Sequence, residues 1–258
     1  MNMNNFEYLR DQIKYSGFGE HLESDLKKHI EQGKPEFQLK HSTDFGHDKV
    51  NAELNFSKSK QTDMYFFNSY QVQIEKPDNQ LASSQLFYIN KNNNITFKEA
   101  YNLMDGRSVH KNLTNKQGES FEAWLQLDFK QTDDQGNFKL KQYHENYGYN
   151  LDSELSKHTI KELTNQTYKD NLTESLKKGN VQSATLIRDG VEQKVTLEAN
   201  PQYKTVNIAE FVSNDMKQQN DRTLVTRQGQ KDLVHDKSKS EDVKKTQTKQ
   251  SRNKKQSM

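Results

Sequence analysis

The densest group of chemically capable side chains in this sequence is the run from Tyr143 to Tyr149, which holds three tyrosines, an imidazole, a carboxylate and an amide. His144 beside Glu145 could serve general acid–base chemistry, since imidazole titrates near neutral pH. Adjacent side chains on a strand point to opposite faces, however, and tyrosines at strand ends commonly pack with their hydroxyls in water. Packing is therefore the stronger interpretation, and recognition of a ligand or partner is favoured over catalysis for Tyr143, His144, Tyr147 and Tyr149.

A second aromatic run extends from Met64 to Tyr70. If it is a strand with one wet face, alternate rings are exposed, which would suit stacking on single-stranded bases or contact with a protein surface. Tyr65 and Phe67 are the candidate binding residues in this run. Burial of both faces beneath neighbouring helices is the commoner explanation.

Two further cations are candidate binding residues. Arg107 follows a predicted helix-ending glycine, as Lys34 does, and Lys178 directly precedes one; Lys116 ends the segment Leu113–Lys116. The usual role of a cation beside such a glycine is a favourable interaction with the C-terminal end of the helix dipole.

Catalytic and metal-binding motifs are missing from the sequence. It has no cysteine, no G-x-S-x-G elbow, no H-E-x-x-H, no phosphate-binding loop and no G-x-G-x-x-G after a strand. The eight histidines are dispersed, with His21 and His29 eight residues apart on a predicted helix and His41 and His47 in a predicted loop. Direct zinc ligation from a helix normally uses i and i+4. We expect no metal, no cofactor and no enzymatic activity.

Charge and hydropathy divide the chain. Mean hydropathy is −1.18 and only 30% of residues are apolar, so no run approaches the roughly 18–20 apolar residues that span a bilayer, and the N-terminus does not resemble a signal peptide. Residues 212–258 hold twelve Lys and Arg against six Asp and Glu, and no aromatic residue. Such a segment predicts a disordered tail, which either binds a polyanion weakly or only solubilises the protein. The polyanion-binding candidates are Lys244, Lys245, Lys254 and Lys255.

Three segments of residues 1–211 show one order of elements: an amphipathic helix, a terminal glycine, and then strands with alternating apolar positions. The glycines are Gly33, Gly106 and Gly179, spaced 73 residues apart. Before them, apolar residues recur at helical spacing, as at Leu22, Leu26 and Ile30, or at Tyr168, Leu172 and Leu176. Thr96 and Glu99 form a capping box at the start of the second helix.

Alternating residues after each glycine predict half-buried strands of antiparallel sheets. The clearest are Val50 to Phe56, Phe121 to Phe129 and Val195 to Ala199, with hairpin turns at Asp134–Asn137 and Asp189–Gly190. We therefore predict an α+β fold of three helix-plus-meander units. Their boundaries are 1–76, with an extra N-terminal helix; 77–150, opening with a linking segment in which Leu86–Ile89 form a strand; 151–211, with an extra helix; and the tail, 212–258.

Several segments together resemble a family of unknown function from Bacteroidota. They are Thr96–Leu103, Gly106–Val109, Leu113–Lys116, Ala123–Phe129, Tyr143–Tyr149 and Ala199–Lys204. Members of that family are typically encoded on conjugative or mobilisable elements, near topoisomerase and helicase genes. The resemblance implies a setting, a cytoplasmic accessory protein of a mobile element, and no catalytic residue.

The expected function is thus that of a non-enzymatic binding or adaptor protein, whose partner is a protein or the DNA of the mobile-element machinery. Two alternatives remain at this point. One is an effector that inhibits a host defence factor by surface binding or mimicry, which the acidic body would permit. The other is an unrecognised nuclease or hydrolase.

Overall fold

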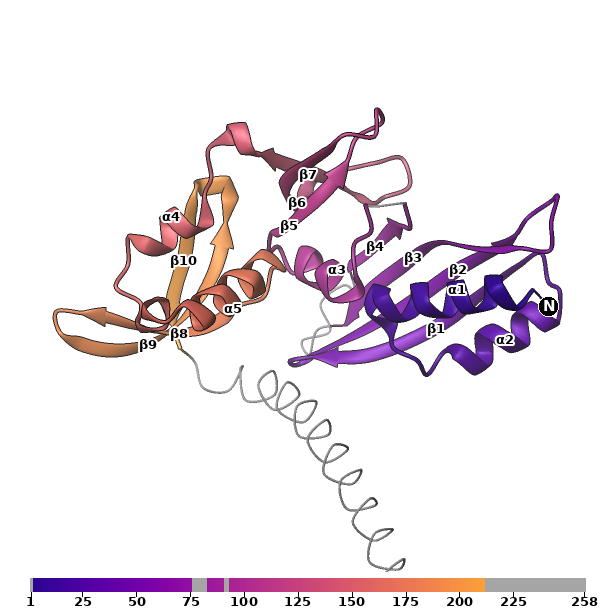
Figure 1. Cartoon of the computed structure of the whole chain (residues 1–258), viewed down its shortest axis with the longest axis horizontal. Helices are drawn as coiled ribbons and strands as arrows, with labels where there is room; N and C mark the ends of the chain where they lie inside the picture. The colour runs from indigo at the N-terminus through magenta and orange to yellow at the C-terminus, as the bar shows by residue number, and fades with distance from the viewer. Residues whose placement is uncertain (1, 76–82, 91–92, 212–258) are drawn as a thin grey trace, which may run out of the picture. The chain divides into compact units, whose positions relative to one another are not determined.

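The computed structural model describes residues 2–75, 83–90 and 93–211, and within them it shows an α+β fold with five α-helices and three antiparallel sheets (Figure 1). The predicted fold class is confirmed in these terms. Residues 212–258, with the four candidate lysines of the predicted tail, lie outside the described residues. No described helix has the length and apolarity needed to cross a membrane.

The first sheet is a four-stranded meander in the order β1-β2-β3-β4. Its strands are β1 (Glu36–Phe45), β2 (Asp48–Lys58), β3 (Tyr65–Glu75) and β4 (Ser83–Tyr88). The alternation predicted on β2 is observed, because Val50, Ala52, Leu54 and Phe56 are all buried on one face. The expected boundary after residue 76 separates β4 from the sheet to which it is hydrogen-bonded.

Helices α1 (Met3–Ile13) and α2 (Glu23–Glu31) lie against one face of this sheet (Figure 1). A five-residue π-helical turn, η1 (Lys14–Phe18), joins them, and Gly17 within it adopts φ 94°, which a residue with a β-carbon rarely tolerates. Each helix turns an apolar stripe towards the sheet. The buried residues of these stripes are Phe6, Leu9, Ile13, Leu22, Leu26 and Ile30.

Helix α3 (Phe97–Met104) begins at the predicted capping box. The backbone N–H of Thr96 donates to Glu99 Oε2 over 2.8 Å, and the Glu99 N–H faces Thr96 Oγ1 at 3.5 Å. The buried Glu99 carboxylate also accepts from Lys111 Nζ, which offsets the cost of burying its charge. A second meander follows, with β5 (Val109–Thr114), β6 (Ser120–Thr132) and β7 (Phe138–His144).

The last part of the described chain contains two helices and the third meander. Its elements in chain order are η2 (Glu145–Tyr147), α4 (Leu151–Ser156), η3 (Lys161–Thr164), α5 (Gln166–Lys177), β8 (Gln182–Arg188), β9 (Val191–Asn200), η4 (Pro201–Tyr203) and β10 (Thr205–Glu210). The turn at Asp189 and Gly190 has positive φ at both residues, as a two-residue hairpin requires.

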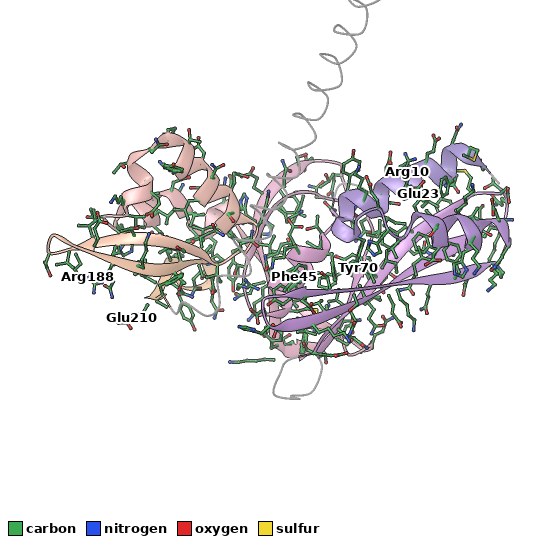
Figure 2. All side chains as sticks on the ribbon, turned by 90° about the horizontal axis from the view of Figure 1, so that it is seen from below. Arg10, Glu23, Phe45, Tyr70, Arg188 and Glu210 are labelled. Atoms are coloured by element: carbon green, nitrogen blue, oxygen red, sulfur yellow. The ribbon has the colours of Figure 1, made fainter. Side chains whose placement is uncertain are left out.

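Two hydrophobic clusters fill the described structure. The first gathers α1, α2, α3 and the inner faces of the first two sheets, and the second gathers α4, α5 and the third sheet. Strand β6 belongs to both, since Ala123 and Leu125 lie in the first cluster while Trp124 lies in the second. Tyr70, labelled in Figure 2, is fully buried in the first cluster and donates its hydroxyl proton to the Ile95 carbonyl over 2.6 Å.

The three helix-ending glycines all adopt positive φ, at 67° for Gly33, 88° for Gly106 and 77° for Gly179. This is the left-handed conformation expected just past a helix end. Two predicted apolar positions are exposed instead of buried: Tyr168 on α5, and Phe129, near a register shift of β6 against β7.

Candidate functional site

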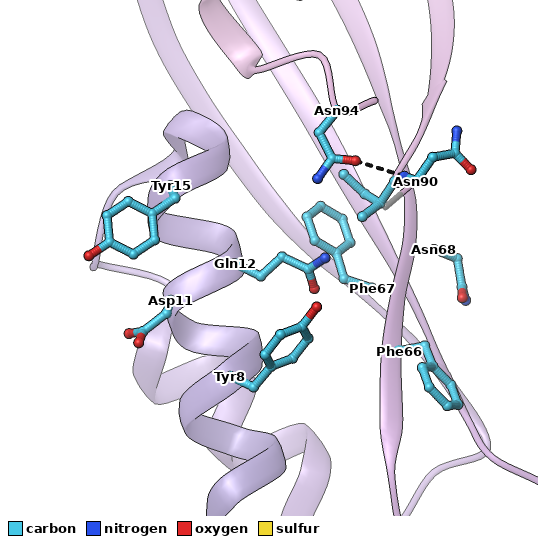
Figure 3. Close-up of a pocket in the computed structure, with 10 residues that line it drawn as sticks. Tyr8, Asp11, Gln12, Tyr15, Phe66, Phe67, Asn68, Asn90 and Asn94 are labelled. Atoms are coloured by element: carbon cyan, nitrogen blue, oxygen red, sulfur yellow. Dashed lines mark hydrogen bonds between the residues drawn. The ribbon is translucent and has the colours of Figure 1, made fainter. Parts of the chain in front are cut away.

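A groove between α1 and β3 has a volume of about 670 Å³. Tyr8, Asp11 and Gln12 of α1 and Tyr15 of η1 are spaced at i, i+3, i+4 and i+7, which places them on one helical face. Figure 3 shows Tyr8, Gln12 and Phe67 directed towards one another across the space between helix and strand. The full lining is Tyr8, Asp11, Gln12, Tyr15, Phe66, Phe67, Asn68, Ile89, Asn90 and Asn94.

The groove lies where β4 leaves the sheet. Strand β4 pairs with β3 only from Ser69 to Ile74, and the Ile89 N–H donates to the Asn68 carbonyl at the end of the ladder. The chain then turns away, with the Asn90 N–H donating to Asn94 Oδ1 over 2.7 Å (Figure 3). Among the described residues, no strand lies beside residues 65–67 on this side of β3.

Asn5 of α1 covers the end of this open edge. Its side-chain Nδ2 donates to the Tyr65 carbonyl over 3.0 Å, and its Oδ1 accepts from the Tyr65 N–H over 2.8 Å. The carboxamide thus makes the pair of bonds that a neighbouring strand would make. Between the bonds made by Asn5 and by Ile89, β3 lines the groove with Phe66 and Phe67.

The groove lining has the chemistry of a binding site. Tyr8, Tyr15 and Phe66 are 64%, 76% and 49% exposed, and carboxamides supply most of its polar groups. Asp11 is the one carboxylate among the lining residues, and Arg10 donates to it over 2.9 Å. Exposed aromatic rings of this kind are typical of contact surfaces.

The Met64–Tyr70 run alternates as predicted, but the exposed set is the opposite one. Tyr65 and Phe67 are only 1% and 4% exposed because they face the helices, whereas Met64 and Phe66 are exposed. The side chains of the two predicted binding residues are therefore core residues. The period of two was visible in the sequence, but the face that the helices cover was not.

The two candidate cations occupy different surroundings. Arg107 is 5% exposed; its guanidinium lies 5.1 Å from the Tyr101 ring centroid and 3.2 Å from the Asp105 carboxylate. Its position is structural, at the end of α3. Lys116 is exposed in the turn between β5 and β6. The structure does not bring either residue to the groove.

Two tyrosines of the Tyr143–Tyr149 run bond to the segment that contains η4 and the start of β10. The Tyr147 hydroxyl donates to the Gln202 carbonyl over 2.8 Å, and the Tyr149 hydroxyl donates to the Thr205 carbonyl over 3.1 Å. Tyr149 also packs edge-on against Trp124. Two segments that carry the family resemblance, Tyr143–Tyr149 and Ala199–Lys204, are thus in direct contact.

The positions of His144 and Glu145 differ from those expected. They were expected to point to opposite faces of a strand, but β7 ends at His144 and Glu145 starts a 3₁₀ turn. Both line a pocket of about 490 Å³ together with Glu122 and Asn112. The His144 ring contacts Phe121 at 5.2 Å between centroids.

Two histidines predicted to be dispersed lie together. His41 is on β1 and not in a loop, and its Nδ1 lies 2.8 Å from His21 Nε2, so that one ring nitrogen donates to the other. Burial, and secondarily the neighbouring charge of His21, lower the pKa of His41 to about 4. Within the part of the chain that the structure describes, no three His, Asp or Glu residues are arranged to hold a metal ion.

Comparison with known protein families, curated proteins and solved structures finds no match to this chain. The functional argument therefore depends on the residues themselves. The residues that sequence reasoning missed are Tyr8 and Tyr15, whose i, i+7 spacing on a predicted helix was the available signal.

Proposed function

We propose that this chain is a non-catalytic binding protein that holds a partner protein in the groove between α1 and β3. One observation carries the proposal: exposed rings line a groove beside the part of β3 at Phe66 and Phe67, where β4 no longer pairs with it and no other described strand takes its place. Tyr8 approaches this edge from the helix, and Phe66 lies on the outer face of β3 (Figure 3).

The chemistry of the lining supports a protein partner. Aromatic side chains supply apolar area at low conformational cost, and they dominate the energetics of protein interfaces. The carboxamides of Gln12, Asn68 and Asn94 can donate to and accept from a peptide backbone. An extended segment of the partner is the occupant that an unpaired strand edge binds best.

The test is affinity purification of the full chain from its native host, with and without nuclease treatment. We expect a stoichiometric protein partner that survives nuclease and is lost from the double variant Tyr8→Ser, Phe66→Ser. Tyr168→Ser is the matched control, because Tyr168 is 63% exposed on α5 and does not line the groove. Retention of the partner by the double variant, or absence of any partner, would refute the proposal.

The biological setting is a proposal that rests on the resemblance. We propose an adaptor of a mobile genetic element, acting in the cytoplasm with DNA-processing or transfer machinery. The partner's identity separates this function from its alternatives. A protein encoded by the element supports the adaptor, a host defence factor supports the inhibitory effector, and nucleic acid cleavage by the purified chain supports the nuclease.

Polyanion binding by residues 212–258 is a separate proposal, supported by the twelve Lys and Arg in this segment. Deletion of the segment should weaken a salt-dependent mobility shift of DNA, because fewer counterions are released on binding. An unchanged shift after deletion would assign DNA binding to residues 1–211.

We also propose that the body is built from a repeated helix-plus-meander unit. Its support is the equal spacing of Gly33, Gly106 and Gly179, with a helix before each and an antiparallel meander after each. The first meander has four strands and the others three. Superposition of the three segments, strand for strand, in a crystal structure would support the unit. Three different crossing angles of the helix on its sheet would refute it.

A further inference from the structure

A tyrosine–lysine surface forms where β7 and η2 meet η4. It consists of Lys139, Lys141, Tyr143, Tyr147, Tyr203 and Lys204. On β7, Lys139, Lys141 and Tyr143 alternate along one face of the strand. The Tyr143 and Tyr147 rings are 4.9 Å apart between centroids, tilted by 54°.

Tyr203 is the most exposed ring of this surface, at 72%. The short η4 turn holds it, since Pro201 restricts the backbone and the Tyr203 N–H donates to Asn200 Oδ1 over 3.3 Å. The Tyr203 hydroxyl is close enough to Lys141 for an electrostatic interaction between them. A large ring is thus kept in solvent on a rigid turn, beside a cation.

Lys204 has an unusual backbone. Its φ and ψ are 52° and 46°, and only one other described residue besides the glycines, Asp189, has positive φ. This left-handed conformation is unfavourable for a residue with a β-carbon. It places the Lys204 ammonium 4.6 Å from the centroid of the Tyr147 ring.

The charges of this surface are incompletely neutralised. Asp128 accepts from Lys141 over 3.0 Å, yet the Lys141 side chain remains 43% exposed. Lys139 is exposed on the same face, and Lys204 contacts a ring and not a carboxylate. Exposed rings beside ammonium groups suit a ligand with flat aromatic faces and regularly spaced negative charges.

We propose that the tyrosine–lysine surface binds single-stranded nucleic acid. A base stacks on Tyr203, and the adjoining phosphates contact the ammonium groups of Lys141 and Lys204. This mode tolerates any sequence, because every base has an aromatic face, and it depends on salt, because phosphate contacts release counterions. The site shares no residue with the α1–β3 groove, so either can fail without the other.

The test is fluorescence anisotropy of the full chain with 5′-labelled twelve-residue oligothymidylate and oligouridylate, over a series of salt concentrations. Stacking of one base is worth about a tenfold change in affinity, so we expect Tyr203→Ala to bind both about tenfold more weakly. Lys204→Gly keeps the left-handed backbone without strain. It should reduce the slope of log affinity against log salt by about 0.7, the value for one lost single-strand phosphate contact.

Two controls make the result decisive. Tyr168→Ala removes a similarly exposed tyrosine outside this surface and should bind within twofold of the unaltered chain. Photocrosslinking of a 5-iodouridine oligonucleotide should label the peptide that contains Tyr203. The proposal is overturned if the unaltered chain does not bind, if a labelled duplex binds as tightly as the single strand, or if Tyr203→Ala and Tyr168→Ala behave alike. The last outcome would assign binding to another part of the chain, such as residues 212–258.

Discussion

The contact between His21 and His41 predicts a specific loss of stability in mild acid. His41 lies on β1 with its ring edge-on to Phe18 and Phe97, at 5.6 Å and 5.0 Å between centroids. A proton on this ring would be poorly solvated and would face His21 at 2.8 Å. The pKa of His41 is accordingly lowered from 6.5 to about 4 in the folded chain.

The direction in which stability changes with pH depends on whether the folded or the unfolded chain binds more protons. Between pH 6.5 and 4, the unfolded chain protonates His41 and the folded chain does not, so acid favours unfolding. The stabilisation is complete above pH 6.5 and is lost as the pH falls towards 4. The difference between the two pKa values corresponds to about 3 kcal/mol in the free energy of unfolding. Because water screens the partly exposed ring, we expect roughly 1.5–3 kcal/mol of this loss to be measured.

Urea denaturation followed by far-UV circular dichroism at pH 4, 5, 6 and 7.5 measures this loss. His41→Gln keeps a polar side chain on β1 but cannot titrate. Between pH 6.5 and 4, the free energy of unfolding of the unaltered chain should therefore fall by roughly 1.5–3 kcal/mol more than that of the variant. His110, whose pKa is also lowered by burial, titrates in both proteins and cancels in the comparison. Parallel curves for the two proteins would refute the reasoning.

Four substitutions test other contacts by chemical denaturation at neutral pH. Gly179→Ala should cost roughly 2–3 kcal/mol, because φ is 77° and the new Cβ would lie 2.9 Å from a backbone oxygen. Gly190→Ala, with the same φ and nothing within 4 Å, should cost only about 1 kcal/mol, and equal losses would contradict the close approach. Asn5→Ala should cost about 1–3 kcal/mol by leaving the N–H and C=O of Tyr65 without their partner, and a neutral effect would show that water replaces the carboxamide. Tyr70→Phe should cost about 1 kcal/mol through loss of its 2.6 Å bond to a buried carbonyl, and unchanged stability would deny that bond a net contribution.

Local signals in the sequence predicted much of the secondary structure. The Thr96–Glu99 capping box, the Asp189–Gly190 hairpin and the left-handed glycines depend on a few neighbouring residues, so they can be read without tertiary information. Strand β4 was also recognised from its apolar run, but not its sheet. The apolar pattern of a segment marks it as a strand but does not say which strand it pairs with.

The candidate site was harder to predict for the same reason. Tyr65 and Phe66 are adjacent and chemically similar, and only the position of α1 decides that the first is buried and the second exposed. The contact between His41 and His21 joins β1 to the segment before α2, and no rule of sequence spacing predicts it. Tyr203 and Lys204 belong to no periodic element, so the sequence marked them only as part of the segment Ala199–Lys204 and did not indicate that they lie beside Tyr147.

Trp124 is the single tryptophan of the chain, and its place on β6 makes it a selective optical probe. Its indole packs with the second hydrophobic cluster, while Ala123 and Leu125 on either side pack with the first. Tryptophan emission therefore follows melting around α4, α5 and the third meander. If tryptophan emission and circular dichroism give different unfolding midpoints, the two clusters unfold separately. Strand β6 would then mark the boundary between the part that is still folded and the part that has unfolded.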